Sequence, residues 1–117
     1  MKWEDQRAEF ETTISELKEL LFQKGKEYAG DHDALGNFKS ADDLGVDPMQ
    51  KLGIFMDKHY SSIKSYIKHG KVYSNESIEG RINDLMNYAF LLRCLIKDLK
   101  EEGKLDGQKE NKETHVI

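Results

Sequence analysis

Three stretches of this chain repeat apolar residues at the spacing of an amphipathic helix. The last stretch, residues 76–102, has no proline, and its apolar residues recur every three or four positions: Ile78, Ile82, Leu85, Ala89, Leu92, Ile96 and Leu99. Such a repeat gives a helix one apolar stripe that faces a core. Between residues 88 and 96 the sequence YAFLLRCLI is apolar almost all round, with Arg93 as the exception. This segment is predicted to be buried on most of its sides.

The two earlier helices are predicted over residues 3–26 and 48–69. The first carries a stripe of Phe10, Ile14, Leu17 and Leu21. The second begins at Asp47-Pro48, an N-cap followed by proline at the first helical position, and it ends before a C-cap glycine, Gly70. Its core residues are predicted to be Met49, Leu52, Phe55, Met56, Ile63 and Ile67. Ser74 or Asn75 can cap the third helix.

The segment between the first two helices contains Gly25, Gly30 and Gly36, so it is predicted to be a helix end and a loop. Residues 40–45 could add one short helical turn. We therefore expect an all-α fold, a small bundle of three to four helices. Residues 1–103 would form the helical domain, and the unpatterned polar residues 104–117 would form a disordered tail.

Composition excludes several classes of protein. The formal net charge of −4 argues against bulk binding to nucleic acid or to an anionic membrane. No apolar run reaches the ~18–20 residues of a membrane span, and the N-terminus lacks the apolar region of a signal peptide. A cytoplasmic location is therefore expected. The single cysteine, Cys94, lies among apolar residues and is interpreted as a small buried side chain.

Three sets of charged residues could be functional, but each also has a simpler structural interpretation. Glu16 and Glu19 lie one turn apart, but they belong to a helix that is charged throughout and are interpreted as solvated. The triplet Asp31, His32 and Asp33 could ligate a metal, although turn chemistry explains it better. The basic row Lys64, Lys68 and Lys71 fits a helix C-terminus, with a phosphate contact as the alternative.

Three short motifs, in this order, resemble a known family. They are Lys24-x-x-Glu27-Tyr28, then Asp57-Lys58, and then Glu76-Ser77-Ile78 followed by Asp84-x-x-Asn87-Tyr88. Together they are similar to the small helical phage and prophage proteins called nucleotide modification associated domain type 1. The resemblance covers about residues 20–99, and it implies a nucleotide-related role in the cytoplasm of a bacterial host. It does not imply a defined reaction.

A looser resemblance is to the all-α nucleoside triphosphate pyrophosphatases, or MazG-like proteins. Those proteins hold Mg²⁺ between helical carboxylates and substrate phosphates, and the matching acids here would be Asp57, Glu76, Glu79 and Asp84. We take Asp57, Glu76 and Asp84 as the metal-ligand candidates. Gly80 stands where the phage family has another acid, and Ser61 stands where it has arginine. These two departures indicate altered or absent catalysis.

The sequence therefore predicts a small phage-type protein that binds a nucleotide and either hydrolyses it or helps to modify it. The predicted cleft is lined by Lys24, Glu27, Tyr28, Asp57, Lys58, Asp84, Asn87 and Tyr88. Two alternatives stay open: a protein that sequesters a nucleotide without turnover, and a helical interaction module whose polar cluster is only structural. A homodimer or higher oligomer is expected through the second half of the last helix, at Phe90, Leu91, Cys94 and Leu95.

Overall fold

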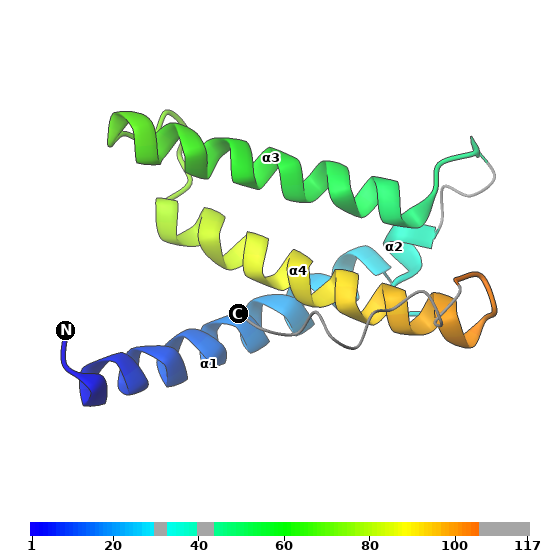
Figure 1. Cartoon of the computed structure of the whole chain (residues 1–117), viewed down its shortest axis with the longest axis horizontal. Coiled ribbons are helices and arrows are strands. Elements are labelled where there is room, and N and C mark those ends of the chain that lie inside the picture. Colours follow the sequence, from blue (N-terminus) through cyan, green and yellow to red (C-terminus); the bar gives the residue numbers. More distant parts are fainter. Residues whose placement is uncertain (30–32, 40–43, 106–117) are drawn as a thin grey trace, which may run out of the picture.

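The structure is a computed structural model that describes residues 1–29, 33–39 and 44–105, without the side chains of Lys24 and of residues 26–29. Those ranges contain four helices and no β-strand: α1 (Trp3–Ala29), α2 (Gly36–Lys39), α3 (Pro48–His69) and α4 (Ile78–Glu101). The predicted all-α class is confirmed. In Figure 1, α3 and α4 form an antiparallel hairpin, and α1 crosses α4 on the side away from α3.

The ends of α3 are where local sequence signals place them. The Asp47 side chain accepts a hydrogen bond of 2.8 Å from the backbone N–H of Met49, and Pro48 follows it at the first helical position. At the other end, Gly70 adopts the left-handed conformation, with φ of 70°, that stops the helix. The cap of α4 was predicted at the wrong residue. Ser77 caps it instead, because its hydroxyl accepts from the N–H of Gly80 at 3.0 Å.

The short helix α2 lies in a segment that was predicted to be a loop. Asp33 begins it, since its carboxylate accepts from the N–H of Leu35 at 2.9 Å and its carbonyl accepts from the N–H of Gly36. Leu35 and Phe38 are then buried against the hairpin. Burial of these two side chains outweighs the glycine content of the segment. The expected turn at 40–45 lies mostly outside the described residues.

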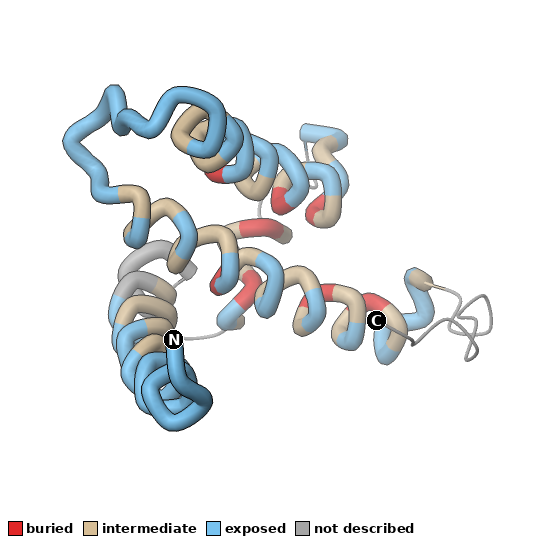
Figure 2. The backbone as a smooth tube through the Cα atoms, turned by 60° about the vertical axis from the view of Figure 1, so that its left-hand side comes forward, coloured by how far each residue is buried: buried red, intermediate tan, exposed pale blue. Residues whose placement is uncertain are grey.

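The core is small and lies where the start of α3 meets the end of α4. Leu52 and Leu95 are fully buried, and Leu35, Phe38 and Leu99 complete the cluster. Figure 2 shows buried residues on the facing sides of α3, α4 and α2. Leu105 also packs against this core, so the folded part continues past the predicted end at residue 103. The rest of the predicted tail lies outside the described residues.

An ion-pair network ties α2 to the end of α4. The Lys39 amine contacts the carboxylates of Asp33 at 3.3 Å, of Glu102 at 3.1 Å and of Asp98. The hydrogen bond to Asp98 is the main reason that the pKa of Lys39 is raised well above its usual range. This network holds α2 in place over the core.

The buried face of α4 is rotated from the predicted stripe, although it shares Leu99 with that stripe. Ile82 and Ala89 are exposed, while Leu95 and Asn87 are buried. Of the four residues predicted to form an oligomer surface, Leu95 is fully buried in the core, Leu91 and Cys94 are half-buried against it, and Phe90 is about half exposed. The core therefore uses the edge of the predicted stripe that contains Leu99, together with Leu95 and Leu91 beside it.

The first half of α1 has no cover within the part of the chain that the structure describes. Every residue from 1 to 12 is exposed, including Phe10 at 65%, although Phe10 was predicted as a core residue. Ile14, Leu17 and Leu21 are half-buried where α1 crosses the rest of the domain. None of the four helices combines the length and apolar character needed to cross a membrane.

Candidate functional site

A buried histidine lies at the centre of the contact between α3 and α4. The side chain of His59 is packed face to face on the Tyr88 ring, with centroids 5.2 Å apart. Its Nδ1 atom lies 3.5 Å from a guanidinium nitrogen of Arg81 and 3.9 Å from Oδ2 of Asp84. The closer group is a donor, so Nδ1 is best placed as an acceptor on a neutral ring. We call His59, Arg81, Asp84 and Tyr88 the His59 cluster.

Burial lowers the pKa of His59 below its ordinary value of 6.5. The nearby Asp84 carboxylate opposes this effect, Arg81 and Lys58 add to it, and Glu76 opposes it. The unfolded chain therefore binds a proton at His59 at a higher pH than the folded chain does.

This shift predicts a pH dependence of stability. The contribution of His59 is fully present above about pH 6.5 and is lost as the pH falls from the unfolded value toward the folded value. We expect His59→Gln to flatten the decline in melting temperature between about pH 7 and pH 5. The control is His69→Gln, since His69 is exposed and should leave the decline unchanged. An unchanged slope in His59→Gln would contradict this assignment.

Arg81 extends the His59 cluster toward the tip of the hairpin. Its side chain is 13% exposed, and its Nε atom lies 2.9 Å from the carboxylate of Glu76. That nitrogen is nevertheless buried without an acceptor in hydrogen-bonding geometry among the described residues. The Glu76 carboxylate is therefore the nearest anion to this nitrogen, and the two groups form an ion pair without good hydrogen-bond geometry.

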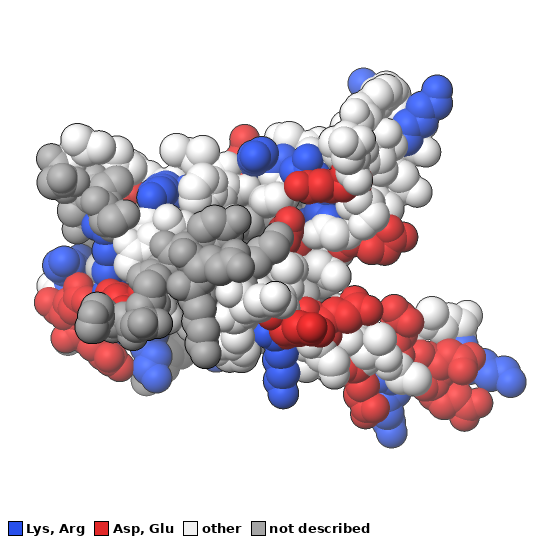
Figure 3. Space-filling model, turned by 180° about the vertical axis from the view of Figure 1, so that it is seen from behind, with Lys and Arg blue, Asp and Glu red and all other residues white. Residues whose placement is uncertain are grey.

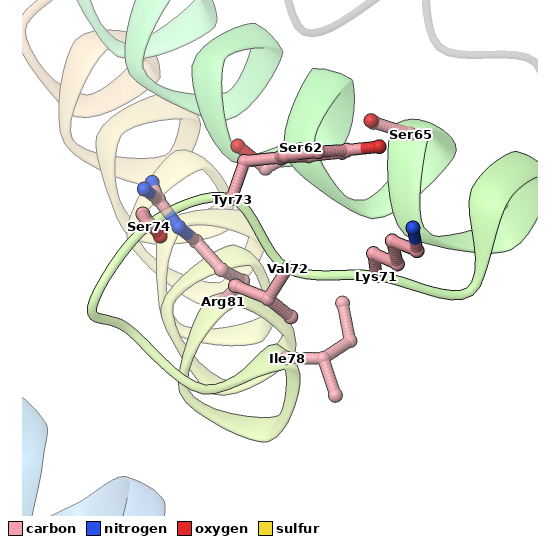
Figure 4. A pocket seen from close by; sticks show the side chains of 8 residues that line it. All are labelled: Ser62, Ser65, Lys71, Val72, Tyr73, Ser74, Ile78 and Arg81. Atoms are coloured by element: carbon pink, nitrogen blue, oxygen red, sulfur yellow. The ribbon is translucent and has the colours of Figure 1, made fainter.

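The tip of the hairpin carries an open pocket of about 220 Å³ beside Arg81. Its lining consists of two cationic, four hydroxyl-bearing and two apolar side chains: Lys71, Arg81, Ser62, Ser65, Tyr73, Ser74, Val72 and Ile78. Figure 4 shows Arg81 and Lys71 at opposite ends of this pocket, with Tyr73 between them. We call it the hairpin pocket. Its lining has hydrogen-bond donors and positive charge, and no carboxylate.

Local backbone structure adds to the positive character of the hairpin pocket. Ile78 is both a lining residue and the first residue of α4, so the pocket lies at a helix N-terminus. The free N–H groups and the dipole at a helix start favour anions. In Figure 3, both basic and acidic side chains lie at this end of the hairpin, and acidic side chains predominate on the N-terminal half of α1.

The structure brings together only some of the predicted site residues. Asp84 and Tyr88 meet in the His59 cluster, whereas Asn87 donates a hydrogen bond of 3.3 Å to the carbonyl of Leu17 and joins α4 to α1. Asp57 is exposed and lies two residues from His59, about 200° round α3. It therefore points away from the helix contact that holds Asp84.

The remaining candidates fall outside that cluster or outside the described side chains. Lys58 is exposed, and Glu76 pairs with Arg81. Among the described residues no group of three or more His, Cys, Asp or Glu side chains is arranged to hold a metal. The side chains of Lys24, Glu27 and Tyr28, and all of Asp31 and His32, lie outside the description.

Gly80 is the third residue of α4, whose N-cap is Ser77. A Cβ atom there would lie 3.1 Å from the Ser77 hydroxyl, so a side chain would require this hydroxyl to shift by a few tenths of an ångström. An acid at the third helical position is the usual partner of a serine N-cap in a capping box. The structure therefore gives no steric reason for the absence of an acid at Gly80.

Sequence reasoning missed Arg81, His59 and the serines of the hairpin pocket. The only signal for the pocket was the basic row that includes Lys71, whose phosphate-binding interpretation was the less favoured one. No protein-family model, no curated protein and no solved structure matches this chain.

Proposed function

We propose that this protein binds a nucleotide, or a closely related small molecule with a phosphate group, in the hairpin pocket. The observation that carries the proposal is the lining of the pocket, which presents Arg81 and Lys71 together with four hydroxyl groups and no carboxylate, although the Arg81 Nε is paired with Glu76 at 2.9 Å. Cationic side chains together with hydroxyl and helix-start donors are the usual partners of phosphate oxygens.

The size of the pocket favours partial enclosure of such a ligand. Pockets for whole drug-sized ligands have volumes of about 300–1,000 Å³. The hairpin pocket, at about 220 Å³, suits a phosphate group, with the sugar and base lying outside it. Tyr73 is 76% exposed at its rim and can stack on a base. The proposal keeps the class of ligand that the motif resemblance implies but places it at other residues, because Ile78 is the one motif residue in the lining.

Glu76 would act as an internal competitor for the ligand. Its carboxylate holds the position 2.9 Å from Arg81 Nε that a phosphate oxygen would take. A bound phosphate would displace Glu76, and the freed carboxylate, next to the ligand phosphates, is of the oxygen type that Mg²⁺ uses. A magnesium-assisted mode of binding is therefore part of the proposal, and turnover is a separate question.

Thermal unfolding with a panel of ligands tests the proposal. Inorganic phosphate, sulfate, mononucleotides, nucleoside triphosphates and cyclic nucleotides would each be added with and without Mg²⁺. A nucleotide at a hundredfold excess over its Kd should stabilise the protein by about 2.7 kcal/mol. We expect this stabilisation by the nucleotide to be lost at high salt, because salt screens the contacts between the cationic side chains and the phosphate. No shift with any phosphate compound would contradict the proposal.

Product analysis on the same samples separates the remaining alternatives. Stabilisation with intact nucleotide indicates a sequestering protein, and stabilisation with hydrolysed nucleotide indicates an enzyme. A helical interaction module would show neither stabilisation nor product.

A further inference from the structure

One face of α1 is apolar along its length but covered along only half of it. Trp3, Phe10, Ile14, Leu17 and Leu21 share this face, which we call the α1 stripe. Leu17 and its neighbours in the second half are half-buried beside α4. Trp3 and Phe10 are 85% and 65% exposed. A helical segment of about 12 residues has only marginal stability in water unless another element packs on it. We therefore expect a packing partner for the exposed half of the α1 stripe.

We propose that the bare half of the α1 stripe pairs with the same segment of a second copy of this chain, in the antiparallel direction. The inference is independent of the nucleotide proposal. It rests on self-complementarity: when residue 3 of one copy lies opposite residue 14 of the other, Trp3 meets Ile14, and Arg7 meets Phe10. A guanidinium over an aromatic ring is favourable.

Charge selects the antiparallel direction over the parallel one. Arg7 lies at the edge of the α1 stripe, and in a parallel pair the two copies of Arg7 would face each other. The positive ends of both helices, and the acidic first-turn residues Glu4 and Asp5, would also lie side by side. In the antiparallel pair Arg7 lies over the partner copy's Phe10 and beside its Glu11. At 100° per residue the acidic residues Asp5 and Glu9 lie on the side of α1 away from the α1 stripe.

The area available fits a weak dimer. Two Trp3 and two Phe10 rings, at about 150–250 Å² each, would bury about 600–1,000 Å². The flanking side chains bring the interface to the lower end of specific contacts, about 1,200 Å². We therefore expect a dimer that forms at micromolar concentration and dissociates on dilution.

Sedimentation of the full chain over a range of concentrations tests the pairing. The wild-type protein should move from the 13.5 kDa monomer toward twice that mass. Phe10→Glu should weaken association at least about 30-fold, the effect of losing about 2 kcal/mol at the centre of an interface. Phe22→Glu is the matched control, because Phe22 is 64% exposed on the same helix but off the stripe. A wild-type monomer at every concentration, or a dimer unaffected by Phe10→Glu, would overturn the proposal.

Disulfide trapping tests the direction of the pair in a Cys94→Ala background. A mixture of Gln6→Cys and Thr13→Cys chains should cross-link between copies, since these positions lie on the same side of the antiparallel pair. Lys2→Cys chains should not cross-link, because the two positions would be about 20 Å apart along the helices. Efficient cross-linking of Lys2→Cys without cross-linking of the mixture would refute the antiparallel arrangement.

Discussion

Replacing Leu95 with alanine is expected to lower the free energy of unfolding by about 3 kcal/mol. Leu95 is fully buried and belongs to the single core cluster found in the described residues, together with Leu52 and Leu99. The substitution removes apolar contacts and leaves a cavity that three helices cannot easily close. With so few fully buried side chains, the loss would be a large part of the marginal stability of a small domain.

Chemical denaturation measures this loss, with Leu44→Ala as the control. Leu44 is 80% exposed, so the same change in side chain should shift the unfolding free energy by less than about 0.5 kcal/mol. Equal effects of the two substitutions would show that Leu95 is not at the centre of the core.

Replacing Arg81 with glutamine is expected to weaken phosphate-ligand binding by about 10- to 100-fold. The variant loses a charge-assisted hydrogen bond, which is worth about 1.5–3 kcal/mol, to the ligand. Glu76→Gln should act in the opposite direction and tighten binding, because Glu76 holds the Arg81 Nε that the ligand needs. Opposite effects from the two partners of one ion pair are hard to obtain from a merely structural contact.

Calorimetric titration of the variants with nucleotide checks these effects. Arg93→Gln is the matched control: Arg93 is on the same helix but exposed, so the loss of one positive charge there should change affinity little. If Arg81→Gln and Arg93→Gln weaken binding equally, the ligand responds to overall charge and the hairpin pocket is not its site.

The ends of a helix could be predicted where residues next to them in the sequence determine them. Both ends of α3 follow from residues next to them in sequence, the Asp47-Pro48 start and the Gly70 stop. The buried face of α4 could not be predicted in the same way. A helix that is apolar on almost every side has no one face that the sequence marks as buried. The packing of α3 therefore decides that Leu95 is buried and Ile82 is not.

The candidate site depends even more on packing. The sequence selected Asp57 and Lys58, whereas the neighbouring His59 is the residue that α3 turns toward α4. Arg81 is a candidate binding residue because it is mostly buried and lines the pocket. Neither property can be deduced from the amino-acid sequence alone. Asp84 is half-buried in the helix contact, where its carboxylate lies 3.9 Å from Nδ1 of His59.

The most direct test of nucleotide binding at the hairpin pocket is an amide NMR titration of the ¹⁵N-labelled protein with inorganic phosphate and then with a nucleotide. The account predicts saturable shifts centred on the pocket, at Ser62, Ser65, Lys71, Tyr73, Ser74, Ile78 and Arg81. Nucleotide should produce larger shifts at Tyr73 than phosphate does. Saturable shifts confined to the α1–α4 contact around Leu17 and Asn87, or no saturable shifts with any phosphate compound, would contradict it.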